Sequence, residues 1–126
     1  FDYAGWNSNG ITVNVGANVT RIPSYLFFAD NYQYLPKITE VKFAEESVCE
    51  NIGDYAFYEC TYLNVIELPD NLINIGDNAF GRCKKLLNVE IPNSVMSIGD
   101  AAFYWCTSLT SVSNSIIPIV CHQTNT

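Results

Sequence analysis

The sequence has few of the side chains from which most catalytic and metal-binding sites are built. Its 126 residues include one histidine, His122, and no two cysteines are separated by just two residues. Zinc sites need several converging histidine or cysteine ligands, and a cysteine nucleophile needs an imidazole that faces its sulfur. Cys121 and His122 are adjacent, so in an extended chain their side chains point apart. We therefore expect no catalytic residue, no metal site and no cofactor.

Positive charge is also scarce. Six lysines and arginines stand against thirteen aspartates and glutamates, for a formal net charge of −7, and no basic run occurs. Contacts to phosphates need clustered lysine and arginine, so we expect no nucleic-acid partner, and an anionic membrane surface is disfavoured for the same reason. No apolar stretch approaches the ~20 residues that span a bilayer, so we expect no membrane insertion.

The chain nevertheless has enough apolar residues to form a core. Hydrophobic residues make up 48% of it, which excludes a disordered polypeptide. A chain of this length buries roughly two thirds of the surface that its unfolded form exposes, so it needs no metal or disulfide to fold. We expect a single domain over residues 1–126.

A repeat of 23 residues runs through the second half of the sequence. "IGDYAFYEC" at Ile52 returns as "IGDNAFGRC" at Ile75 and as "IGDAAFYWC" at Ile98. The columns that keep this register are Ile52/Ile75/Ile98, Gly53/Gly76/Gly99, Asp54/Asp77/Asp100, Ala56/Ala79/Ala102, Phe57/Phe80/Phe103, Cys60/Cys83/Cys106 and Leu63/Leu86/Leu109. Self-similarity at such a period is typical of solenoid proteins, in which stacked units bury a continuous core.

Weaker copies of the unit precede the clear ones. "VGANVTRIP" matches "IPNSVMSIG" in its apolar positions, which aligns Ile22 with Ile52 and Phe27 with Phe57 after about seven inserted residues. Cys49 then shares a column with Val19, Leu72 and Val95. The clear repeats cover 52–112, the looser ones 11–51, and a divergent tail covers 113–126. This tail is compatible with a cap or with the edge of a longer array.

Each unit contains one evident strand. "LNVIEL", "LLNVEI", "LTSVSN", "ITEVKF" and "ITVNV" alternate apolar and polar residues, as half-buried strands do. We predict a β-rich leucine-rich-repeat solenoid of about 4.5 units, with a parallel β-sheet of five strands on one face. On the other face we predict short strands at "LINIG" and "VMSIG", followed by helical or 3₁₀ turns. The glycine column permits a tight turn, and the aspartate column is placed to N-cap the helical turn.

The cysteine column allows several interpretations. Neighbouring units lie about 4.8 Å apart, which is within the Cα range of a disulfide, but parallel side chains leave the Cβ atoms too far apart for the bond. We therefore expect Cys60, Cys83 and Cys106 to be reduced and buried, as small hydrophobic residues. The aspartates also suggest a repeated calcium site, but such a site needs several converging oxygens, so capping fits one aspartate per unit better.

The unit resembles the BspA-type, or Treponema pallidum-type, leucine-rich repeat family. Its consensus, roughly L-x-x-I-x-I-P-x-x-V-x-x-I-G-x-x-A-F-x-x-C, is followed closely from Leu63 to Val112. The resemblance implies secreted or surface-attached proteins, mostly of host-associated bacteria. It also implies adhesion, with binding to host or neighbouring-cell proteins. It identifies no ligand and no oligomeric state, and the repeated residues are structural.

Binding residues are therefore expected where the repeat varies. The outward positions of the strands are one candidate surface, and the tyrosines of the inserted segment "DNYQYLP" are another, because insertions in repeat proteins often bind. The candidates are Tyr32, Tyr34, Glu40, Lys42, Glu67, Asn88 and Glu90. A solvated face without a ligand remains an alternative for the strand positions. Tyr58, Tyr62, Tyr104 and Trp105 occupy variable positions of the turn, where they cover the convex side or contact other domains.

The sequence thus favours a non-catalytic protein-binding module. The alternative is a structural spacer that displays other domains of a larger surface protein. An enzyme is disfavoured because no acid–base pair or nucleophile cluster recurs or converges.

Overall fold

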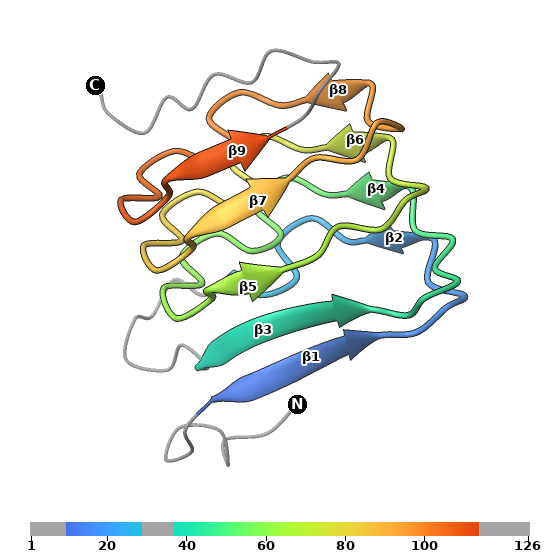
Figure 1. Cartoon of the computed structure of the whole chain (residues 1–126), viewed down its shortest axis with the longest axis horizontal. Coiled ribbons are helices and arrows are strands. Elements are labelled where there is room, and N and C mark those ends of the chain that lie inside the picture. Colours follow the sequence, from blue (N-terminus) through green and yellow to red (C-terminus); the bar gives the residue numbers. More distant parts are fainter. Residues whose placement is uncertain (1–9, 29–36, 114–126) are drawn as a thin grey trace.

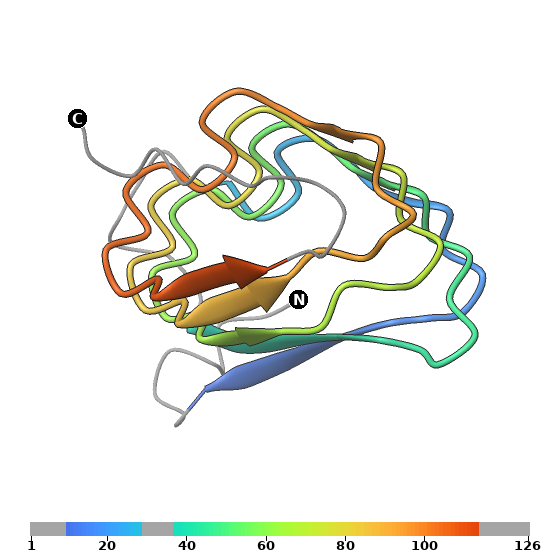
Figure 2. The ribbon, with the colours of Figure 1, turned by 45° about the horizontal axis from the view of Figure 1, so that its top comes forward.

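The chain coils into a stack of short parallel strands in a computed structural model that describes residues 10–28 and 37–113 (Figure 1). The strands of the described residues are β1 (Ile11–Val15), β2 (Arg21–Ile22), β3 (Ile38–Phe43), β4 (Asn51–Ile52), β5 (Val65–Ile66), β6 (Asn74–Ile75), β7 (Asn88–Glu90), β8 (Ser97–Ile98) and β9 (Ser111–Ser113). Figure 2 shows successive turns of the coil following nearly the same outline. The predicted β-solenoid is therefore confirmed, with about four turns.

Two layers of parallel strands flank the core. One contains β1, β3 and β5, followed by the pair β7 and β9, and the other is a four-stranded sheet in the order β2-β4-β6-β8. Ile22 pairs with Ile52, which pairs with Ile75, and Ile75 pairs with Ile98. The alignment of Ile22 in the weak N-terminal unit with Ile52, Ile75 and Ile98 is thus confirmed. The short strands expected at "LINIG" and "VMSIG" are β6 and β8.

The larger strand layer is not the single five-stranded sheet that the sequence predicted. Among the described residues, β3 pairs with β5 and β7 pairs with β9, but β5 and β7 belong to different sheets. β5 has only two residues, Val65 and Ile66, and the partners of both lie in β3.

The predicted helical or 3₁₀ turns are also absent from the described part of the chain. Residues 54–59 form successive turns in which Tyr55 and Glu59 adopt left-handed backbone angles, with φ of 59° and 64°. A left-handed residue interrupts a right-handed helix. Alternate N–H groups instead donate to the next turn of the solenoid, for example Tyr55 to the Asp77 carbonyl at 2.9 Å and Phe57 to the Ala79 carbonyl at 2.8 Å. Hydrogen bonds between turns of the solenoid thus replace those within a helix.

The aspartates cap neighbouring turns rather than helices. The Asp77 N–H donates to Oδ1 of Asp54, and the Asp100 N–H donates to Oδ1 of Asp77, both at 2.8 Å. The expected N-cap role is therefore corrected, because each carboxylate satisfies an orphan backbone donor one turn further along the stack. The alternative of a calcium site at these aspartates has no support, because residues 10–28 and 37–113 contain no group of three His, Cys, Asp or Glu residues that could hold a metal ion.

The glycine column is needed for close stacking. A Cβ at Gly76 would lie 2.5 Å from Oδ1 of Asp54 and 2.6 Å from its backbone nitrogen. The turn before it is therefore in contact with the glycine backbone itself. The backbone angle is not the reason, because the left-handed positions of this turn are occupied by Tyr55 and its equivalents.

The core is a set of ladders formed by equivalent side chains of successive turns. Phe57, Phe80 and Phe103 stack with ring centroids 5.2 and 5.4 Å apart, and Phe27 continues the column at 5.6 Å. Phe80 is fully buried. The inward strand positions Val15, Val41, Ile66, Leu68, Val89 and Ile91 are buried, and Val13 and Phe43 are partly buried against them.

Candidate binding surface

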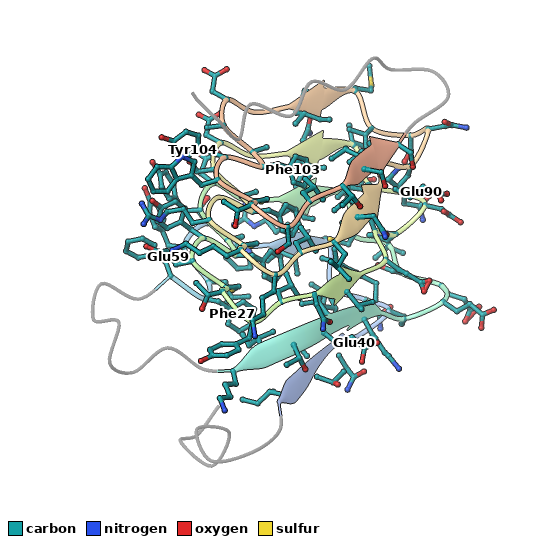
Figure 3. The ribbon with its side chains drawn as sticks, turned by 60° about the vertical axis from the view of Figure 1, so that its left-hand side comes forward. Phe27, Glu40, Glu59, Glu90, Phe103 and Tyr104 are labelled. Carbon is teal, nitrogen blue, oxygen red and sulfur yellow. The ribbon has the colours of Figure 1, made fainter. Side chains whose placement is uncertain are left out.

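The predicted strand residues lie together on one side of the solenoid. Glu40 and Lys42 belong to β3, Glu67 follows β5 directly, and Asn88 and Glu90 belong to β7. All are exposed except Glu40, which is partly buried. Figure 3 shows Glu40 and Glu90 on the strand side, Glu59 and Tyr104 on the side of the turns, and Phe27 and Phe103 between them. Tyr32 and Tyr34, the other two candidates, lie outside the described residues.

Glu40 is held in place by its neighbours. Its Oε1 accepts a hydrogen bond from the Thr12 hydroxyl at 3.2 Å, and its Oε2 lies 3.8 Å from Nζ of Lys42. The Lys42 side chain is 60% exposed, so this ion pair contributes little to stability. Its effect is local, because it neutralises the carboxylate at this end of the strand face.

Glu67 and Glu90 have a different environment, beside two hollows in the surface. One hollow, of about 340 Å³, is lined by Ile66, Glu67, Leu68, Asp70, Asn88, Glu90 and Pro92. The other, of about 650 Å³, is lined by Asp70, Glu90, Ile91, Pro92, Asn93, Val112 and Ser113. The smaller hollow lies between β5 and β7, which do not pair, and the larger one lies beyond the end of β7, beside β9. The strand face is therefore acidic and indented at the C-terminal ends of β5 and β7.

A cluster of aromatic rings on the side of the turns was not predicted from the sequence. Tyr25 and Tyr55 stack with centroids 5.2 Å apart and planes at 3°, and Phe28 and Tyr58 meet them at 5.0–6.1 Å. Tyr25 is 54% exposed. The signal was present, because Tyr25 and Tyr55 share one column of the alignment and Phe28 and Tyr58 another. Aromatic clusters of this kind are enriched at protein interfaces.

Further up the stack the same side of the molecule contains a charged pair beneath a tryptophan. Nε of Arg82 lies 3.4 Å from Oε2 of Glu59, whose side chain is buried. The Arg82 guanidinium lies 4.6 Å from the ring centroid of Trp105, which in turn stacks on Tyr104 at 5.5 Å. Of the four aromatic residues expected at variable positions, Tyr58, Tyr104 and Trp105 thus lie on the side of the turns, whereas Tyr62 lies between Lys37 and Lys85.

The corner before the strands contains a column that the sequence reasoning missed. Lys37 and Lys85 lie on the turns before and after Tyr62, with their Nζ atoms 5.5 and 5.2 Å from its ring centroid. Lys84 is exposed beside Lys85. The signal was hidden by an insertion, since Lys37 falls into the column of Tyr62 only after Val41 is aligned with Ile66.

Cys49, Cys60, Cys83 and Cys106 are buried, as predicted for the last three, and Cys49, Cys60 and Cys83 have free thiols. The Cys83 thiol donates to the Phe57 carbonyl at 3.2 Å, and the Cys106 thiol to the Phe80 carbonyl at 3.1 Å. Burial raises the pKa of Cys60 to about 12. Burial, together with the neighbouring Cys60 and Cys106, raises the pKa of Cys83 well above its ordinary value. A thiol that keeps its proton is a poor nucleophile and a poor metal ligand.

The fold and this surface define the class of protein, a leucine-rich-repeat solenoid with a variable strand face. Residues 29–116 match the family model described as BspA type leucine-rich repeat region, in six copies. Since the match covers well over half of the chain, the protein belongs to this family. Its members are generally protein-interaction or repeat modules and are typically not enzymes. The family is typically found in surface or secreted proteins.

Two solved structures share the fold. A leucine-rich repeat protein of Treponema pallidum has a TM-score of 0.64 and 24% identity, over 83% of this chain and 59% of that one. A leucine-rich repeat protein of Bacteroides ovatus has a TM-score of 0.54 and 27% identity, over 82% of this chain and 33% of that one. The chain thus spans less than two thirds of either protein. A comparison with curated proteins finds no match.

A membrane-spanning helix does not occur in the part of the chain that the structure describes.

Proposed function

We propose that this chain is a non-catalytic protein-binding module of an adhesin-like protein at the cell surface or outside the cell. Its partner is a protein of the host or of a neighbouring cell. The observation that carries the proposal is the contrast between the two kinds of position in the repeat. The repeated residues pack in the core or form hydrogen bonds between turns, whereas the side chains of the strand face are exposed and vary from turn to turn.

Three features of the strand face support protein binding there. The outward side chains of adjacent strands form a surface on a rigid scaffold. The hollows beside Glu67 and Glu90 offer concave sites next to charge, and exposed apolar side chains such as Val65 lie next to the charged ones. Glu40, Lys42, Glu67, Asn88 and Glu90 are the proposed contacts on this face, and Tyr32 and Tyr34 remain proposed contacts from the inserted segment.

A structural spacer is the second candidate, because the chain corresponds to only part of the longer repeat proteins that it resembles. The two functions differ in whether any partner is bound. The immobilised chain should be exposed to a mixture of secreted and extracellular-matrix proteins, and every captured protein should then be titrated against the purified chain.

The control for this experiment is matched in charge. The double variant Glu67→Gln/Glu90→Gln should lose about tenfold or more in affinity for a captured protein, as expected when central contacts are removed. Glu45→Gln/Glu46→Gln changes the net charge equally at exposed residues before β4 and should bind like the unaltered chain. If the chain is a spacer, no captured protein should bind the purified chain in the titration. Binding with the same affinity to both double variants and to the unaltered chain would also favour a spacer.

A further inference from the structure

The lysines of this acidic chain are concentrated at one corner. Lys37, Lys84 and Lys85 lie on the segments that lead into β3 and β7, and among the described residues none of them has a carboxylate within 4.0 Å. The ion pairs seen in residues 10–28 and 37–113 involve Lys42 and Arg82 instead. The same part of the chain contains eleven carboxylates. The three lysines, which pair with none of them, therefore form a positively charged patch on an acidic protein.

The corner is ordered by the aromatic ring at its centre. Tyr62 lies between the two turns that bear Lys37 and Lys85, and both ammonium groups are within cation–π distance of its ring. Long lysine side chains otherwise lose considerable rotamer freedom when they bind. The contacts with Tyr62 therefore hold two charges near each other before any ligand arrives.

Apolar side chains adjoin the lysines. Leu87, two residues after Lys85, is 51% exposed, and Val65, three residues after Tyr62, is 46% exposed. Both face solvent because the inward positions of their turns are filled by Leu86 and Ile66. A partner that covers this corner therefore gains by bringing negative charge and apolar surface together.

We propose that the corner formed by Lys37, Tyr62, Lys84, Lys85, Val65 and Leu87 docks an acidic peptide segment of a protein partner, with aspartate or glutamate beside leucine-like residues. Its carboxylates pair with the lysines, and its apolar side chains cover Leu87 and Val65. A sulfated polysaccharide would satisfy the lysines but would leave Leu87 and Val65 in water. The inference rests on the proposed protein-binding function and names one chemistry for the partner.

The test uses the purified chain and two fluorescein-labelled peptides of twelve residues. The first has aspartates and leucines separated by glycine and serine, and the second has serine in place of every leucine, so that the two carry equal charge. Fluorescence anisotropy should show the first peptide binding more tightly than the second, with affinity that falls as salt is raised. Equal binding of both peptides, or tighter binding of heparin, would mean a general polyanion surface and would overturn the proposal.

Variants locate the site. Lys84→Gln/Lys85→Gln should weaken binding of the leucine-containing peptide about five- to tenfold, as expected for two exposed charges. Leu87→Ser should weaken it about threefold or more by removing apolar contact. Lys42→Gln is the matched control, because Lys42 lies beyond this corner and already faces Glu40, and it should have no effect. Retention of affinity in both corner variants would overturn the proposal.

Two further outcomes are separable. Self-association of the chain that is lost in the lysine variant would indicate a second copy as the occupant and would overturn the peptide assignment. If neither peptide binds while captured proteins still depend on Glu67 and Glu90, the inference fails and the proposed function stands. Unchanged thermal unfolding midpoints confirm that the variants are folded.

Discussion

Phe80 shows what the repeated residues do at the scale of a single side chain. It is fully buried, and its ring is stacked between those of Phe57 and Phe103. Because the same residue recurs on each turn, one side chain supports two identical neighbours. The recurrence of phenylalanine at this position is thus explained by packing.

Phe80→Ala is expected to lower the free energy of unfolding by about 3–5 kcal/mol, the usual effect of deleting a core aromatic ring. Urea denaturation of the variant and the unaltered chain measures the difference. Met96→Ala is the control, since Met96 is 81% exposed, and it should change the stability by less than about 0.5 kcal/mol. A loss below about 1 kcal/mol for Phe80→Ala would contradict the stacked core.

The buried thiols predict a dependence of stability on pH. The pKa of Cys60 is about 12 in the folded chain, against 9.0 for an ordinary cysteine. Below pH 9 the thiol is neutral in both states, so it adds no pH dependence. Above that pH the unfolded chain loses the proton and the folded chain keeps it, so stability falls as pH rises from 9 toward 12.

Urea unfolding between about pH 8 and pH 10 measures this effect, which for one thiol amounts to about 1 kcal/mol at the upper end. Tyrosines and lysines also titrate in this range, so the comparison is with Cys60→Ala, in which the decline should be shallower by that amount. Equal slopes in the two proteins would show that Cys60 ionises as readily when folded as when unfolded.

At the scale of the element, the turn depends on contacts between units as well as within one. Its alternate N–H groups donate to the next unit, its carboxylate caps the next unit, and its glycine touches the preceding unit. An isolated turn would therefore lose every second backbone hydrogen bond. This accounts for cooperation between neighbouring units in repeat proteins.

Gly76→Ala tests this dependence on neighbours. The added Cβ would meet backbone and carboxylate atoms of Asp54 at about 2.5 Å, so we expect a loss of about 1–3 kcal/mol, the range for overpacked sites. Gly16→Ala is the control, because no atom lies within 4 Å of its added Cβ. The thermal unfolding midpoint of Gly76→Ala should therefore lie clearly below that of Gly16→Ala. Similar midpoints for the two variants would contradict close stacking at Gly76.

The sequence predicted the strands and their register because these depend on periodic burial. Ile22 aligns with Ile52 from apolar positions alone, and β2 pairs with β4 in that register. The turns were wrongly predicted as helical because the segment after Asp54 has local features of a capped helix. Its competing hydrogen bonds come from another unit, which local sequence does not reveal.

The candidate surfaces were predictable to different degrees. Outward strand positions follow from alternation, so the exposure of Glu67 and Glu90 was predictable. The smaller hollow beside them lies between β5 and β7, and no periodic pattern encodes the missing pairing of these strands. The Lys37–Tyr62–Lys85 column was missed because an insertion separates Lys37 from the clear repeats, and its alignment needs the register of β3 with β5.

At the scale of the whole molecule, the repeat separates stability from recognition. The core ladders and bonds between turns give a scaffold whose inner residues are fixed by their neighbours. The strand face is acidic at the C-terminal ends of β5 and β7, where Glu67, Asp70 and Glu90 line the hollows. The corner that precedes β3 and β7 bears three lysines instead. The chain thus presents two surfaces of opposite charge on one rigid support, and a partner is selected by the variable residues.

Hydrogen–deuterium exchange of the chain, with and without a captured partner, tests this separation most directly. The account predicts slower exchange in segments that contain β5 and β7, residues 62–68 and 84–91, where the proposed contacts lie. Exchange at β6 and β8, residues 74–75 and 97–98, should be unchanged. Protection confined to β6 and β8, with none at β5 or β7, would contradict the claim that recognition lies on the variable strand side.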